Sequence, residues 1–249
     1  MNILRDVVRV TGADAATFLQ GQLSQDVEAL APSGSAWSLI LQPQGKVDAW
    51  VRVTRVSADE FLLDVDAGFG GRVITRLDRF LLRVKAAVEL VGEQTFAVDE
   101  RASEDQPLAA VGRAVDGAVD GDWAARWNEL RVRLGIPAMG AELTDDTIPE
   151  EVGLVDASVS FTKGCYTGQE LVARIDSRGR NVPRRLRRIV APQTLEVTAE
   201  LVHEGKVVGR VTSAAGAVGL GFVARSVEAP AEVEVAGGVA RIEPLPPLR

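Results

Sequence analysis

Residues 163–170 read Lys-Gly-Cys-Tyr-Thr-Gly-Gln-Glu, and they contain the only cysteine of the chain. The thiol of Cys165 lies between two glycines, and Lys163 lies just before it. Apolar residues at helical spacing follow residue 170, which predicts that Cys165 lies at or near a helix N-terminus. Backbone N–H groups at such an end, together with a nearby ammonium, favour a thiolate over a thiol. The pattern therefore indicates a reactive thiol. A small buried core residue is the alternative, because free cysteines are often buried.

The composition predicts a soluble protein with one large domain or several small ones. A chain of 249 residues with 46% apolar and 25% charged residues has enough apolar side chains for extended cores. Its formal net charge of −7 argues against a general nucleic-acid coat or a binder of anionic membranes. Charged residues interrupt the apolar N-terminus, and no run approaches the roughly 18 apolar residues of a membrane span. A single cysteine excludes an internal disulfide, so we expect a cytoplasmic protein without membrane contact.

Histidine and cysteine are too scarce for several mechanisms. His203 is the only histidine, so a serine or cysteine triad would have to use it. It lies between a predicted strand and a glycine turn, which favours an exposed position. A zinc site needs about four nitrogen or sulfur ligands, and an iron–sulfur cluster normally needs four thiolates. We therefore expect no metal site from this chain alone; any metal chemistry would be shared with a partner or a small molecule.

Hydrophobic periodicity in the first part of the chain predicts an α+β sheet with helices on one face. Strands are expected over residues 3–10, 37–41, 47–56, 61–65 and 86–90, and helices over residues 13–19 and 70–83. A Pro-Gln-Gly turn at residues 43–45 joins two of these strands into a hairpin.

The remainder of the chain has two different sequence patterns. Residues 92–121 are irregular, with short strands expected over 95–98 and 109–114, and a helix over 123–134 ends at Gly135. From about residue 185, short strands alternate with glycine turns, which predicts a small antiparallel barrel or sandwich. These patterns divide the chain into residues 1–91, 92–182 and 183–249.

Arginines gather just after the cysteine segment. They are Arg174, Arg178, Arg180, Arg184, Arg185, Arg187 and Arg188. A guanidinium clamps carboxylate or phosphate through paired hydrogen bonds, so the cluster indicates an anion site beside Cys165. A solvated face with a linker is the alternative, because charge runs commonly have that role.

The four tryptophans can pack in the core or stack on a flat heteroaromatic ligand. They are Trp37, Trp50, Trp123 and Trp127. Trp127 is the candidate for stacking, because polar residues flank it in the predicted helix.

With these residues together, the chain resembles the YgfZ family, which are folate-binding proteins related to the aminomethyltransferase of the glycine cleavage system. Residues 163–170 are similar to the family signature, and residues 10–27 are similar to its N-terminal motif. Gly45-Lys46-Val47 matches the hairpin turn of the family, and residues 242–246 match its C-terminal end. The resemblance spans most of the chain, although the region 92–126 looks shorter than in larger members.

The resemblance implies an α+β, aminomethyltransferase-like fold with a ring-like arrangement around a central folate pocket. Residues 1–91 would be the N-terminal folate-binding subdomain, residues 92–182 a shortened middle subdomain, and residues 183–249 a C-terminal antiparallel β-barrel. It also implies that Cys165 is needed for function, and that Trp127 corresponds to a tryptophan of the folate pocket.

Two groups of site residues are expected. The catalytic group is Cys165, as a thiolate, with Lys163 holding part of the thiolate charge. The cofactor, tetrahydrofolate or another folate form, would be bound by Trp127, Gly164, Tyr166, Gly168, Gln169, Glu170 and Arg174. The two glycines would allow close backbone approach, and Gln169 or Glu170 would orient the loop or cap the helix.

The chain also departs from the family pattern. Ala49 and Trp50 stand where aminomethyltransferases carry an aspartate pair that includes the catalytic residue. Asp48 lies one step earlier, and a one-residue shift in a strand turns a side chain to the opposite face. We therefore do not expect an active aminomethyltransferase. Arg133 replaces a glutamate near the pterin edge, and Arg5 replaces a pocket tryptophan and could meet the glutamate tail of a folate.

The leading hypothesis is a cytoplasmic folate-binding accessory protein that supports iron–sulfur cluster assembly or repair. Cys165 would offer one sulfur ligand or form a transient mixed disulfide. Its partners would be folate and iron–sulfur assembly proteins or client enzymes, with tRNA modification affected indirectly. Two alternatives remain: a tetrahydrofolate-dependent one-carbon (aminomethyl or methyl) transferase, and an RNA- or protein-binding module that uses the arginines.

Overall fold

A six-stranded antiparallel sheet forms the N-terminal part of the structure. The computed structural model describes residues 1–248, and the strand order in this sheet is β2-β3-β4-β1-β5-β6. The strands are β1 (Asn2–Thr11), β2 (Ser35–Leu41), β3 (Val47–Arg55), β4 (Glu60–Asp66), β5 (Ala87–Val98) and β6 (Val111–Ala114). The β2–β3 hairpin and strands β1 and β4 therefore lie where the sequence predicted them.

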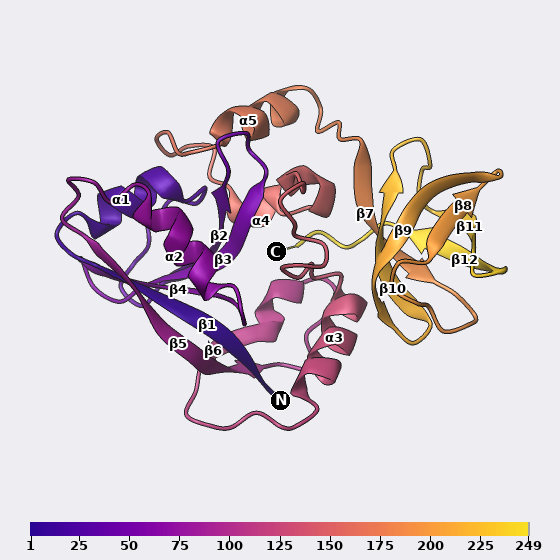
Figure 1. Cartoon of the computed structure of the whole chain (residues 1–249), viewed down its shortest axis with the longest axis horizontal. Coiled ribbons are helices and arrows are strands. Elements are labelled where there is room, and N and C mark those ends of the chain that lie inside the picture. Colours follow the sequence, from indigo (N-terminus) through magenta and orange to yellow (C-terminus); the bar gives the residue numbers. More distant parts are fainter. Residues whose placement is uncertain (249) are drawn as a thin grey trace.

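Helices α1 (Ala15–Gln22) and α2 (Gly70–Asp78) lie on one side of this sheet (Figure 1). The carboxylate of Asp6 on β1 accepts the backbone N–H groups of Gly68 and Gly70 at 3.0 and 2.7 Å, which fixes the start of α2. Helix α2 ends before the predicted residue 83. The chain turns there, with Arg83 at a left-handed φ of 64°, to return into β5.

Strand β5 is longer than predicted, because two expected strands join into one. Both halves pair with β1, and Val91 is the extra residue of a β-bulge in which Gly92 has a φ of 110°. The sheet therefore continues across residue 92, where the sequence suggested a domain boundary, and it extends to β6 after a short 3₁₀ turn at Pro107–Ala110.

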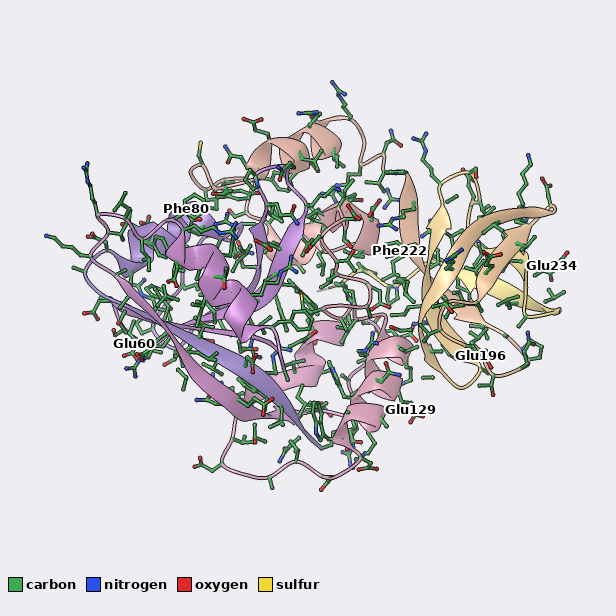
Figure 2. The ribbon with its side chains drawn as sticks, viewed as in Figure 1. Glu60, Phe80, Glu129, Glu196, Phe222 and Glu234 are labelled. Carbon is green, nitrogen blue, oxygen red and sulfur yellow. The ribbon has the colours of Figure 1, made fainter. Side chains whose placement is uncertain are left out.

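The C-terminal part is a closed antiparallel barrel in the order β10-β7-β12-β11-β8-β9. Its strands are β7 (Arg184–Val190), β8 (Glu200–His203), β9 (Lys206–Ala215), β10 (Val218–Ala224), β11 (Ala231–Val235) and β12 (Gly238–Glu243). Phe222, labelled in Figure 2, lies on the side of the barrel that faces the rest of the molecule and belongs to the main core. The predicted fold class, α+β with a C-terminal β-barrel, is confirmed.

A middle segment connects the sheet to the barrel. It contains α3 (Trp123–Leu134), a 3₁₀ helix η2 (Pro149–Val152), α4 (Val155–Ser158) and α5 (Gln169–Ser177). Helix α3 ends at Gly135, whose φ is 73°, as the sequence predicted. It contacts β1 on one side and β9 and β10 on the other, so it sets the spacing of sheet and barrel (Figure 1). None of the helices in residues 1–248 is long and apolar enough to cross a membrane.

Candidate functional site

The cysteine segment is seated on the turn of the β2–β3 hairpin. Gly168 has a φ of 83°, and a Cβ atom there would overlap the carbonyl oxygen of Gln42. Gly45 has a φ of 82°, and a Cβ atom there would overlap the side chain of Leu171. The two glycines therefore let two backbones approach each other closely, although they lie far apart in sequence. This contact explains why both motifs are rich in glycine.

Lys163 anchors the cysteine segment to the loop after α1. Its ammonium donates hydrogen bonds to the carbonyl oxygens of Gln20, Leu23 and Gln25 at 2.6, 2.6 and 2.9 Å. It also lies 5.2 Å from the centre of the Tyr166 ring. These contacts occupy all three N–H groups, because an ammonium has three donors. These contacts give Lys163 a structural role in holding the loop. This role differs from the expected one of holding the thiolate charge.

Cys165 and Tyr166, which are adjacent in sequence, differ in exposure. Tyr166 is buried in the core, and its burial raises the pKa of its phenol to about 12. Cys165 is exposed, which excludes the alternative of a buried core thiol. Helix α5 begins at Gln169, so Cys165 lies in the loop before the helix. The side-chain oxygen of Gln169 accepts the Tyr166 N–H at 3.2 Å and so orients this loop, whereas Glu170 is exposed.

The partly buried position of Lys163 predicts how the free energy of unfolding depends on pH. Burial lowers its pKa from 10.5 to about 8, against the attraction of Asp26 and Glu28. The folded protein therefore releases this proton at lower pH than the unfolded chain does. The unfolded state then binds more protons above pH 8, and this group makes the free energy of unfolding rise with pH. In urea denaturation between pH 7.5 and 9.5, Lys163→Met should show a smaller rise than the wild type. The exposed control Lys206→Met should match the wild type, and equal slopes for all three proteins would contradict the assignment.

The second part of the candidate site is a cavity of about 250 Å³ between the sheet and α3. Trp123 and Trp127 of α3 line it, together with Phe69 and Met139, so one wall is largely aromatic. Asp66, at the end of β4, supplies a carboxylate. One oxygen of Asp66 accepts from Arg5 at 2.8 Å, and the other accepts the Met139 N–H at 2.9 Å. The cavity thus combines flat apolar walls with one fixed acceptor group.

Arg131 fixes the wall that carries Trp127. This buried guanidinium donates to Asn128 at 2.7 Å and to Ser213 of β9 at 2.7 Å, and it pairs with Glu142 at 3.2 Å. Glu142 is fully buried and also accepts from Thr212 and Ser213 at 2.6 Å each. The network connects α3 to the barrel across the cavity. The sequence did not indicate Asp66 or Arg131, because nothing in the local pattern distinguishes them from surface charges.

The structure does not bring the predicted site residues to one place. Of the predicted folate-binding residues, Trp127 lines the cavity. The others belong to the loop before α5 or to α5 itself, which lies at the top of Figure 1, whereas α3 lies lower, beside the barrel. The lining of the cavity includes neither Cys165 nor Gly164, Tyr166, Gly168, Gln169, Glu170 or Arg174. Cys165 and the α3 cavity therefore lie in two separate places, and the folate-binding role of these residues stays a prediction.

The departures from the family pattern also have structural explanations. Arg5 is buried and pairs with Asp64 and Asp66 at 2.6 and 2.8 Å, so it is not free to meet a carboxylate tail. The Trp50 indole is buried and donates to Ser158 at 3.0 Å. Asp48 pairs with Arg72 at 2.8 Å.

The arginine cluster is largely neutralised. Arg180 pairs with Asp156 and Asp176, and the other ion pairs are Arg184–Glu151, Arg185–Glu150 and Arg188–Glu104. Arg174 and Arg178 are exposed and form no ion pair with any residue in the described range 1–248. Arg184 and Arg185 therefore attach β7 to carboxylates of η2, and the expected anion site beside Cys165 stays a prediction.

The fold defines the class of protein. The aminomethyltransferase of the glycine cleavage system from Bartonella henselae superposes with a TM-score of 0.78 at 19% identity, covering 98% of this chain and 86% of that one. The chain therefore has the aminomethyltransferase fold.

Sequence comparison identifies the relatives within that class. A tRNA-modifying protein YgfZ from Edwardsiella ictaluri is 28% identical over 217 residues, and one from Escherichia coli is 29% identical over 213 residues. An uncharacterized protein from Haemophilus influenzae is 29% identical over 189 residues, 70% of this chain and 67% of its own. The alignments cover 70% and 69% of this chain and 65% of the length of the two YgfZ proteins. No family model matches the chain. The resemblance to the YgfZ family is confirmed: the chain is similar to YgfZ proteins at 28–29% identity.

Proposed function

We propose that this chain is a folate-binding accessory protein in which the α3 cavity binds the pterin and the exposed thiol of Cys165 acts elsewhere on the surface, in iron–sulfur cluster assembly or repair. The YgfZ relatives are named for tRNA modification, and we propose that any such role here is an indirect result of the same activity. The observation that carries the proposal is the cavity lined by Trp123, Trp127 and Asp66.

The residues of this cavity fit a pterin. Trp127 offers a flat face for stacking, and the carboxylate of Asp66 can accept hydrogen bonds from the ring N–H and amino groups of the pterin. A volume of about 250 Å³ suits the ring system, so the aminobenzoyl-glutamate part would extend outside. When bound, a reduced folate supplies one-carbon or redox chemistry. The protein residues here hold and orient it.

The exposed position of Cys165 supports the second half of the proposal. Gly164 has no atom within 4 Å of its Cβ position in the described chain, so a partner protein can approach the thiol from outside. On binding iron, the thiol would lose its proton to solvent and the sulfur would become one ligand, with the remaining ligands supplied by the partner. Lys163 and Gly168 hold the loop in place for this contact.

A fluorescence titration tests the cavity. Tetrahydrofolate should quench the tryptophan emission of the wild type, and Trp127→Phe should weaken its binding by up to about fivefold, because an aromatic stacking contact contributes roughly 1 kcal/mol and phenylalanine covers less of the pterin. Trp123→Phe provides a matched control on the same helix and should show a smaller loss if Trp127 is the stacking residue. Unchanged affinity in Trp127→Phe would place the folate elsewhere.

Both alternatives have less structural support. By resemblance, the aspartate pair of the aminomethyltransferases corresponds to Ala49 and Trp50 here, and Asp48, one residue earlier, is paired with arginine and does not line the α3 cavity. An RNA-binding surface needs free cations, and four of the seven clustered arginines are in ion pairs.

A further inference from the structure

A second groove lies on the face of the N-terminal sheet opposite α2. Side chains alternate along a strand, so Asp6 faces α2 and its neighbour Val7 faces the opposite side. On that opposite side, a groove of about 300 Å³ runs along the sheet.

The groove exists because the sheet curls strongly. Three strands separate β3 from β6, so in a flat sheet they would lie about 19 Å apart. A guanidinium cannot cross that distance, yet Arg52 of β3 donates to the carbonyl oxygen of Val111 in β6 at 2.7 Å. Strands β3 and β6 are therefore brought together around a concave surface.

The groove has an apolar floor. Val7, Leu62 and Phe96, which come from three neighbouring strands, are among its lining residues. Polar groups from the walls, among them Thr54 and Gln94, surround this floor. The groove therefore has the character of a small-molecule site. Its volume lies at the lower end of the usual range for ligand pockets.

The charges in the groove are unbalanced. Asp64 is the one carboxylate among its lining residues, and its two oxygens already accept from Arg5 at 2.6 Å and Arg52 at 3.0 Å. The Arg5–Asp64 pair also separates the groove from the α3 cavity, since Arg5 lines the cavity and Asp64 lines the groove.

Three arginines line the groove together with this single carboxylate. Besides Arg52, they are Arg55 and Arg113. Arg55 donates to the carbonyl oxygens of Ser57 and Leu30, which carry no net charge. Arg113 is exposed and has no ion pair within residues 1–248. The groove therefore carries excess positive charge above an apolar floor.

We propose that this groove binds a small organic carboxylate with an aromatic or branched apolar body. The carboxylate would receive N–H groups from Arg113 and from the unused Nη2 of Arg52, and the apolar body would lie over Leu62 and Phe96. Guanidinium groups suit a planar carboxylate, because two parallel hydrogen bonds form at once. The apolar floor distinguishes such a ligand from inorganic phosphate, which has no surface to bury there.

Calorimetric titration of the full chain tests this site, with benzoate as the probe. Benzoate should bind, its neutral isostere benzamide should bind at least tenfold more weakly, and inorganic phosphate should not compete. Arg113→Gln should weaken benzoate binding about tenfold or more, since a hydrogen bond between charged groups contributes roughly 1.5–3 kcal/mol. Arg113 is exposed, so this variant should fold normally.

Two controls separate this site from others. Arg178→Gln removes the same charge from an exposed arginine outside the groove, and Trp127→Phe alters the α3 cavity; both should bind benzoate as the wild type does. The proposal is overturned if benzoate gives no heat at millimolar concentrations, if benzamide binds equally well, or if Arg113→Gln has wild-type affinity. A loss in Trp127→Phe alone would assign the benzoate to the α3 cavity and would also contradict the proposal.

Discussion

Cys165→Ala should fold normally and fail to restore iron–sulfur enzyme activity in cells that lack this protein. The side chain is exposed and makes no core contact, so the free energy of unfolding should change by no more than about 0.5 kcal/mol. Loss of the thiol removes the sulfur ligand that the proposed function requires. Activity of a dependent iron–sulfur enzyme in cell extracts, measured at equal protein level, should fall to that of cells without the protein.

A variant that carries the thiol at a different position provides the matched control. Thr162 is also exposed and lies in the same loop, so Thr162→Cys in the Cys165→Ala background restores a surface thiol at a different place. It should not restore activity, because Lys163 and Gly168 position residue 165 and not residue 162. Full activity of Cys165→Ala would exclude the thiol mechanism, and full activity of the double variant would show that position does not matter.

Gly168→Ala should destabilise the protein by about 2–5 kcal/mol. The left-handed φ of 83° costs an L-residue about 1–2 kcal/mol, and the added methyl group overlaps the Gln42 carbonyl, which typically costs a further 1–3 kcal/mol. Urea denaturation should therefore show a lower midpoint with an unchanged slope. The variant should also displace the loop that carries Cys165, because the same contact holds this loop on the hairpin.

Gly164→Ala is the control for that experiment. Its Cβ position has no neighbour within 4 Å among the described residues, and its φ is not positive. Its stability should equal that of the wild type to within about 0.5 kcal/mol. Equal losses in the two variants would mean that the close contact at Gly168 contributes nothing specific.

The secondary structure could be predicted where local patterns decide it. Helix α3 follows from its apolar spacing and from Gly135 at its end, and the β2–β3 hairpin follows from its turn. The continuity of β5 could not be predicted, because it depends on pairing with β1 through a bulge at Val91. The true end of α2 likewise depends on where the chain must enter that strand.

The candidate site, like the secondary structure, could be predicted from the sequence only in part. The residue types of the 163–170 segment and Trp127 are visible in the sequence, and the structure gives each a defined place. Their separation could not be predicted, because it depends on how the hairpin and α3 are arranged in space. The ion pairs of the arginine cluster could not be predicted either, because their carboxylate partners, such as Glu150 and Glu151, come from a different segment.

A crystal structure with tetrahydrofolate bound tests the account most directly. The account predicts electron density for the pterin between Trp127 and Asp66, with the sulfur of Cys165 exposed and out of contact with the ligand. Density for the pterin against the loop of residues 163–168, with the α3 cavity free of ligand, would contradict the division into a folate cavity and a separate surface thiol.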